Sequence, residues 1–66
     1  MDEKKRKRNE KEFDFWTEKD DGERIYWFEI TGKLGWKAKY LKEVDTHEKT
    51  IRFWQEIYDE NNVVLS

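Results

Sequence analysis

The sequence predicts an all-β fold, in which a small antiparallel meander of about five strands forms a rolled sheet or half-barrel. Two observations lead to this prediction. Aromatic and β-branched residues occur in short runs, and polar or glycine-containing links separate these runs. The links are short, which is typical of antiparallel neighbours. Since 66 residues hold one domain, we expect a disordered charged tail over residues 1–12 and a single small β domain over residues 13–66.

The first twelve residues contain no apolar side chain after Met1, so they cannot bury enough surface to offset the entropy of ordering. This composition predicts the disordered tail. A basic run, KKRKR, lies within it and suggests nucleic-acid contacts as an alternative. Acidic residues flank the run on both sides, which favours a solvated tail. The residues of this run are Lys4, Lys5, Arg6, Lys7 and Arg8.

Apolar and polar residues begin to alternate with period two at Phe13, and four further runs follow. The five expected strands cover residues 13–17, 24–31, 36–44, 50–58 and 63–66. Asp20 and Gly22 favour a turn after the first strand, since Gly adopts a positive φ without strain. Gly32 and Gly35 mark the break between the second strand and the third.

One alternative concerns residues 46–60, which would form a helix and make the fold a β-meander plus one helix. The DTHE segment resembles a capping box, and apolar or aromatic residues recur after it at helical spacing. These residues are His47, Ile51, Trp54 and Tyr58. The Thr50–Ile51 and Phe53–Trp54 pairs instead favour a strand, since β-branched and aromatic residues are enriched there.

The register of the central strands can be tested against charge. We pair Ile30 with Trp36 across the glycine-containing link. We pair Val44 with Ile51 across the next link. Opposite charges then lie side by side in three pairs, which are Glu29–Lys37, Glu43–Arg52 and Lys39–Glu56, and no like-charge pair lies directly opposite. This matching supports a strand rather than a helix after the second link.

Both faces of the predicted sheet carry apolar side chains. One face is a complete core face, formed by Phe13, Phe15, Tyr26, Phe28, Ile30, Trp36, Ala38, Tyr40, Val44, Ile51, Phe53 and Ile57. The other face carries a row of large apolar residues, which are Trp16, Ile25, Trp27, Leu41 and Trp54. A single small sheet cannot cover both faces. We expect either a rolled barrel that encloses the core face or two sheets stacked between two chains.

The composition limits how such a domain can be stabilised, because small domains often need disulfides, metals or oligomerisation. The sequence has no Cys and one His, which excludes disulfides, thiolate metal sites and a histidine metal cluster. We expect no cofactor or metal. Its 11 aromatic residues can each bury roughly 150–250 Å². Aromatic packing and association of chains are therefore the expected sources of stability.

Charge is unevenly placed along the chain. Residues 1–12 carry six Lys/Arg and four Asp/Glu, net +2, and residues 13–66 carry eight and twelve, net −4. The charged fraction of 45% is common in thermophilic proteins. No apolar run is long enough to cross a membrane, and no apolar signal region begins the chain. We expect a cytoplasmic protein that does not contact membranes.

The apolar row on the second face is the candidate interface or ligand face. The predicted function is a small non-enzymatic module that forms a homo-oligomer or docks another protein through this face, since Trp is enriched among interface anchors. Lys stems lying over indole rings are an alternative covering of the row. Trp27 beside Lys39 fits that alternative.

A second functional hypothesis is single-stranded nucleic-acid binding through exposed Trp and Lys residues. Besides the basic run, the candidate contacts are Lys37, Lys39 and Arg52. The acidic body disfavours it, because phosphate binding depends on cations that release counterions. An enzyme is not predicted: there is no nucleophilic Cys and no Gly-rich phosphate loop, and His47 lies in a polar link.

Overall fold

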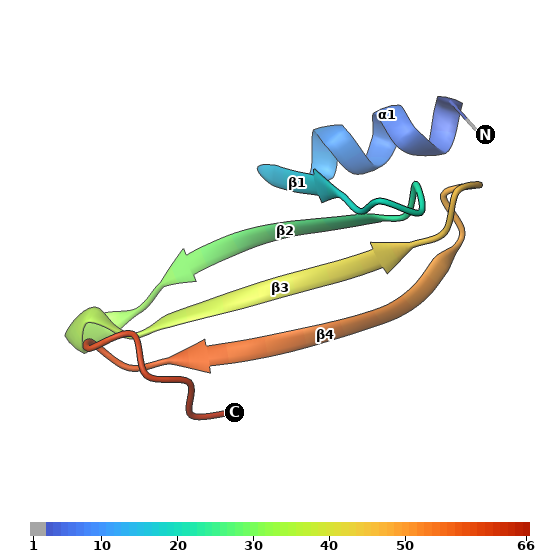
Figure 1. Cartoon of the computed structure of the whole chain (residues 1–66). Coiled ribbons are helices and arrows are strands. Elements are labelled where there is room, and N and C mark those ends of the chain that lie inside the picture. Colours follow the sequence, from blue (N-terminus) through green and yellow to red (C-terminus); the bar gives the residue numbers. More distant parts are fainter. Residues whose placement is uncertain (1–2) are drawn as a thin grey trace.

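The computed structural model describes residues 3–66 and contains four antiparallel strands in an open meander sheet, with one helix (Figure 1). The elements are α1 (Glu3–Glu12), β1 (Phe15–Glu18), β2 (Arg24–Thr31), the 3-10 turn η1 (Lys33–Gly35), β3 (Lys37–Val44) and β4 (Thr50–Tyr58). The strands lie in the order β1-β2-β3-β4. The predicted antiparallel meander is confirmed, as an open sheet of four strands rather than five.

The predicted register between β3 and β4 is confirmed over most of its length, with Leu41 opposite Trp54 and Glu43 opposite Arg52. A β-bulge follows Glu43, and it places Thr50 rather than Ile51 opposite Val44. A bulge inserts one extra residue into one strand and bends that strand. Strand β4 also excludes the alternative helix over residues 46–60.

The register between β2 and β3 differs from the predicted one by two residues. Ile30 lies opposite Ala38 rather than Trp36. The pairing of the two strands continues as far as Gly32, whose amide donates to the Trp36 carbonyl (2.7 Å), so the loop begins later in the chain than predicted. Leu34 (φ 65°) and Gly35 (φ 76°) make this tight closure. A shift of two residues leaves every side chain on its predicted face, since the side-chain period of a strand is two.

Residues 63–66 fold back beside the end of β4, where they form an isolated bridge between Val64 and Tyr58 instead of the expected fifth strand. The Leu65 amide donates to the Ile57 carbonyl (2.7 Å), and the Ile57 amide donates to the Ser66 carbonyl (2.9 Å). The pairing covers only the last residues of β4, which is too short for a regular ladder.

Three of the links are five-residue loops with the same backbone pattern, over residues 19–23, 45–49 and 59–63. In each, the first amide donates to the last carbonyl and the fourth amide donates to the first carbonyl. The fourth residue has positive φ: Gly22 (87°), Glu48 (62°) and Asn62 (63°). Gly and Asn adopt this conformation readily, whereas Glu does so at a cost. Glu48 therefore requires a specific explanation, which the contacts of α1 supply.

Helix α1 occupies the region where the sequence predicted a disordered tail; residues 1 and 2 lie outside the described residues. Lys, Arg and Glu are good helix formers, but α1 has no apolar residue with which to pack. Phe13 follows it directly, with its amide donating to the Asn9 carbonyl (3.0 Å). Polar contacts and this one aromatic ring hold the helix, so a prediction based on apolar surface alone missed it.

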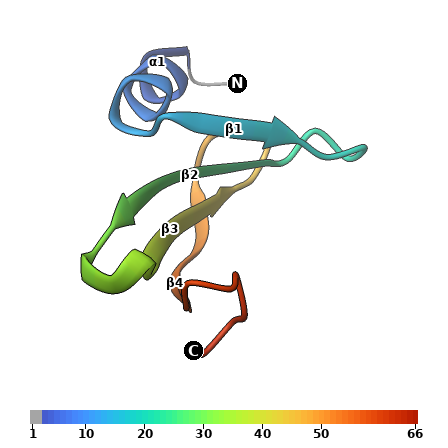
Figure 2. The same ribbon diagram turned by 90° about the vertical axis from the view of Figure 1, so that its left-hand side faces the viewer.

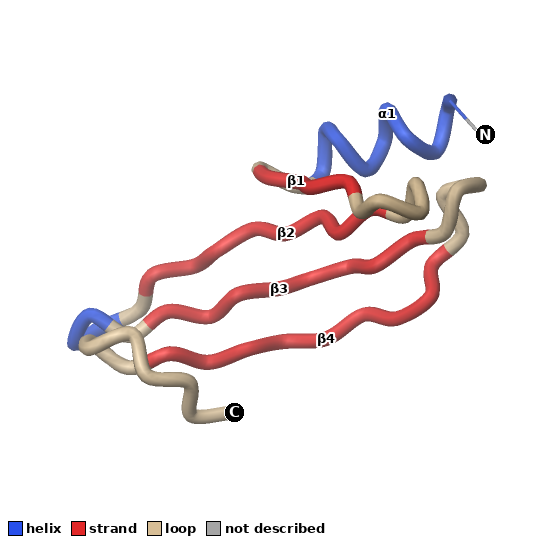
Figure 3. Tube along the Cα trace, in the orientation of Figure 1, coloured by secondary structure: helices blue, strands red, loops and turns tan. Residues whose placement is uncertain are grey.

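α1 and β1 lie beside one end of the sheet only. Figures 1 and 3 show both elements at the end that carries the β3–β4 loop, whereas three strands alone continue to the end that carries η1. Figure 2 shows the twist of the strands and the C-terminal segment near β4. The buried apolar residues are few and lie mainly under α1: Phe13, Tyr26 and Val44 form one cluster.

Candidate functional site

The register assigns the side chains to two faces, because residues directly opposite each other on neighbouring strands share a face. One row across the sheet consists of Trp16, Tyr26, Lys42 and Phe53. The adjacent row consists of Phe15, Trp27, Leu41 and Trp54. Contacts from α1 reach the side of the sheet that carries the first row, and we call this side the helix face. The opposite side carries the second row, and we call it the outer face.

The predicted apolar row is brought together on the outer face except for Trp16. Ile25, Trp27, Leu41 and Trp54 share that face, with Phe15 completing the row. Trp16 lies on the helix face, where the Arg24 guanidinium is 3.8 Å from its ring centroid. The prediction placed Phe13 in the first strand, whereas the strand begins at Phe15, whose side chain is on the outer face.

Side chains of this chain cover Trp27, Leu41 and Trp54 of the outer row, whereas Phe15 at the end of the row is 49% exposed. The Lys39 ammonium lies 4.9 Å from the centroid of the Trp27 ring, and the Arg52 guanidinium lies 3.9 Å from that of Trp54. Leu41, between the two indoles, is only 6% exposed. Cations over aromatic faces are favourable contacts, and their stems shield apolar surface. The structure therefore shows the alternative expected for Trp27, in which Lys39 lies over the indole ring.

Ion pairs and hydrogen bonds surround the outer row. Glu43 is buried and accepts from Lys19 and from Arg52 (2.9 Å). Both cations lower the pKa of Glu43 below its ordinary value of 4.5, and burial opposes them. Of the sheet cations predicted as nucleic-acid contacts, Arg52 pairs with Glu43 and Lys39 lies over Trp27 and opposite Glu56. Lys37 lies opposite Thr31 and Tyr58, neither of which is acidic.

We expect stability to fall as the pH falls below 4.5. The folded-state pKa of Glu43 is depressed, so its contribution is fully present above the unfolded value of 4.5 and is lost as the pH falls through the folded value. Urea unfolding at pH 7 and pH 3 measures the loss. The Glu43→Gln variant should lose less between these pH values. An identical loss in both proteins would assign the effect to other carboxylates, such as Asp45 and Glu56, whose pKa values are also lowered.

A buried hydrogen-bond network joins α1 to the helix face through Glu48. The Glu48 carboxylate accepts from Asn9 Nδ2 (3.0 Å), Tyr26 Oη (2.8 Å) and Arg6 Nε (3.3 Å). Burial and the hydrogen bond to Glu48 both raise the pKa of Tyr26 against the opposing effect of Arg24, so its hydroxyl remains a donor. Three partners thus hold Glu48 in its positive-φ conformation. A Glu at a loop position that favours Gly or Asn is the sequence signal for such a network.

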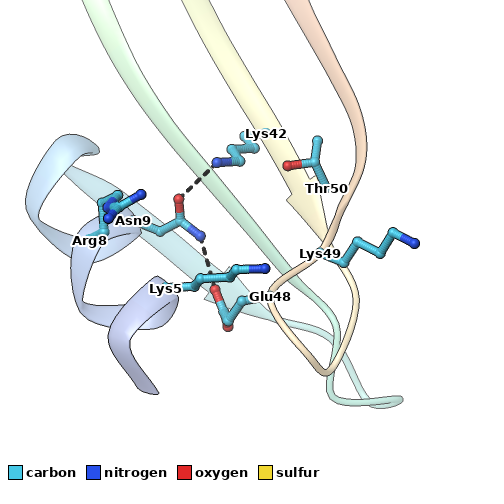
Figure 4. A pocket seen from close by; sticks show the side chains of 7 residues that line it. All are labelled: Lys5, Arg8, Asn9, Lys42, Glu48, Lys49 and Thr50. Atoms are coloured by element: carbon cyan, nitrogen blue, oxygen red, sulfur yellow. Dashed lines mark hydrogen bonds between the residues drawn. The ribbon is translucent and has the colours of Figure 1, made fainter. Parts of the chain in front are cut away.

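A basic pocket of about 220 Å³ lies between α1 and the β3–β4 loop (Figure 4). Its lining residues are Lys5, Arg8, Asn9, Lys42, Glu48, Lys49 and Thr50. Four of these side chains are cationic and one is a carboxylate, so the lining has a net charge of +3. Lys42 Nζ donates to Asn9 Oδ1 (2.9 Å) at the inner side of the pocket. Of the predicted basic run, Lys5 and Arg8 line this pocket, Arg6 binds Glu48, and Lys4 and Lys7 are exposed.

The helix face beyond α1 is apolar apart from Gln55 and is only partly covered, and we call it the open half. Its side chains are Phe28, Ile30, Trp36, Ala38, Tyr40, Phe53, Gln55 and Ile57. Ile30 is 51% exposed and Phe53 is 58% exposed. A hollow of about 190 Å³ is lined by Ile30, Gly32, Trp36, Lys37, Ala38 and Ile57. The predicted core face is therefore a core only at the α1 end.

The fold and these surfaces define a small, mostly β domain: a four-stranded antiparallel meander with one helix docked on half of one face. Comparisons with protein-family models, curated proteins and solved structures found no match. Within residues 3–66, no helix is long and apolar enough to cross a membrane. The same part of the chain contains no group of three or more His, Cys, Asp or Glu residues suited to a metal ion.

Proposed function

We propose that this protein is a small non-enzymatic, cytoplasmic interaction module that self-associates through the open half of its helix face. The observation that carries the proposal is the exposure of this apolar surface. Ile30 and Phe53, on β2 and β4, are each more than half exposed. Contiguous exposed apolar surface on a small domain usually marks an interaction site.

The open half suits a second copy of the same chain. None of its eight side chains is charged, and the cations Lys37 and Lys42 lie only at its borders, so two copies related by a two-fold axis can meet with apolar side chains opposite each other. Two such sheets would stack about 10 Å apart and enclose the hollow between Ile30, Trp36 and Ile57. The net charge of −2 adds little repulsion between copies.

The outer face supports self-association less well than the sequence suggested. Trp27 and Trp54 lie under Lys39 and Arg52, and these contacts would have to be broken before a partner could bind the row. The same contacts count against nucleic-acid binding on this face, since the indole rings that would stack on bases are occupied. The interaction surface is therefore proposed on the opposite side of the sheet from the predicted row.

We expect self-association through the open half to have a modest affinity. Three strands over about five residues each cover roughly 300 Å², which is less than the ~800 Å² per partner of a standard interface. Sedimentation equilibrium from 1 to 500 µM should show a monomer–dimer equilibrium with a Kd of about 1–100 µM.

The Ile30→Glu variant should weaken dimerisation by at least about 100-fold, because each copy would bury an unpaired carboxylate in the apolar interface. Thr31→Glu is the matched control: it adds the same charge one residue away, on the outer face opposite Lys37, and should leave the Kd unchanged. A wild-type chain that stays monomeric at 500 µM would contradict self-association and leave a different protein as the occupant of the open half.

A further inference from the structure

We infer that the basic pocket between α1 and the β3–β4 loop is a binding site for a phosphate group. The site lies at the α1 end of the sheet (Figure 4), where its Lys42 is next to Phe53 of the open half. Its lining carries a net charge of +3 within a chain whose net charge is −2. Such a concentration of cations around a hollow is unfavourable when empty, because like charges repel at short range.

The cations come from separate elements that the fold brings together. Lys5 and Arg8 are three residues apart on α1, so they lie on the same side of the helix. Lys42 is on β3, and Lys49 lies in the loop beside Thr50 at the start of β4. Donors from the helix and the sheet therefore lie close together at the hollow, whereas Figure 4 shows the Lys49 side chain extending from the loop away from Lys5 and Lys42.

The one carboxylate of the lining does not neutralise Arg8, Lys42 or Lys49. Glu48 accepts from Arg6, Asn9 and Tyr26, and its side chain is only 1% exposed. Among residues 3–66, Arg8, Lys42 and Lys49 form no ion pair with an acidic side chain. Lys42 donates to the neutral amide oxygen of Asn9, and its ammonium lies 6.0 Å from the centroid of the Phe13 ring.

A phosphate group matches this set of donors. It carries a charge of about −1.5 to −2 at pH 7 and offers three strong acceptor oxygens. Arg can donate two parallel hydrogen bonds to it, Lys binds it as a point charge, and the Thr50 hydroxyl adds a neutral donor. The pocket is open to solvent and, at about 220 Å³, also has room for the alcohol part of a phosphate ester. A phosphate monoester and a nucleic-acid backbone share this chemistry.

The test is a titration of the full chain with inorganic phosphate, followed by amide chemical shifts at constant ionic strength. We expect saturable shifts confined to the pocket, at Asn9, Lys49 and Thr50. Chloride at the same ionic strength should not produce them. Identical shifts with both anions would overturn the site.

Two double variants remove the same charge from different places. Arg8→Gln/Lys49→Gln removes two lining cations and should weaken phosphate binding by at least about ten-fold. Lys4→Gln/Lys7→Gln removes two exposed cations of α1 that do not line the pocket, and should leave it unchanged. Equal weakening by both variants would show that the overall charge of the helix attracts phosphate without binding it in the pocket. That result would overturn the inference. Circular dichroism confirms that each variant retains α1.

Two further ligands separate the sources of the phosphate. Competition by glycerol phosphate, at an affinity similar to that of an oligothymidine, would indicate a small phosphate ester. Much tighter binding of the oligothymidine, with a steep dependence on salt that Arg8→Gln/Lys49→Gln reduces, would indicate a nucleic-acid backbone. Binding of neither ligand at low ionic strength would contradict the inference.

Discussion

Glu48→Ala is expected to lower the free energy of unfolding by about 3 kcal/mol, a large part of the roughly 3–10 kcal/mol typical of a chain this short. The substitution leaves Asn9 and Tyr26 with buried polar groups that have lost their acceptor. It also keeps a side chain with a Cβ at positive φ, where Glu48 has a φ of 62°. The hydrogen bonds that stabilise this backbone conformation would be lost.

The backbone and side-chain parts of this effect can be separated. Glu48→Gly removes the network but relieves the backbone, so it should cost about 1 kcal/mol less than Glu48→Ala. Asn62→Gly is the matched control, because Asn62 has the same position in an equivalent loop and a φ of 63°. It should change stability by only a few tenths of a kcal/mol. Urea unfolding measures all three variants, and a loss for Glu48→Gly no larger than that for Asn62→Gly would disprove the role of the network.

Phe13→Ala should also cost about 3 kcal/mol and release α1 from the sheet. Phe13 is 7% exposed, and its ring lies 6.0 Å from that of Tyr26 and 5.6 Å from that of Phe28. It is the apolar contact next to a helix that has no apolar residue of its own. Removing it exposes the Tyr26 hydroxyl network to water.

Hydrogen exchange distinguishes release of α1 from global unfolding. The amides of α1 should exchange at the rate of an unfolded peptide in Phe13→Ala, while those of β3 stay protected. Phe15→Ala is the control: Phe15 is 49% exposed and stacks on Trp27, so its loss should cost at most about 1.5 kcal/mol and leave α1 protected. Protection of α1 in Phe13→Ala equal to that in the wild type would contradict the proposed anchor.

The strand pattern was readable from the sequence where alternation and charge agreed. The second strand was predicted at its observed bounds, and the pairing of Glu43 with Arg52 was predicted with its register. Local periodicity and cross-strand charge are properties of neighbouring residues, so a single sequence contains them. The β2–β3 register was off by two residues because Leu34 adopts a positive φ that its residue type does not suggest.

The site was less predictable than the strands. Glu48 meets Asn9 across 39 residues and Arg6 across 42, and no local pattern connects such distant positions. The basic pocket depends on the same docking, since it is formed only when α1 lies against the sheet. The basic run is visible in the sequence, but its position beside Lys42 and Lys49 was not predicted.

The sequence by itself determined that this chain forms an antiparallel meander and which side chains of β2, β3 and β4 share a face, since a period of two leaves no other choice. The tertiary structure decided which of the two faces remains open. Cations stacked on Trp27 and Trp54 cover the two indole rings of the outer face. On the other face, a helix without apolar residues docks through Glu48 and Phe13 and covers only half of it. Both outcomes depend on where long polar side chains find partners in space, which the alternation along a strand does not encode.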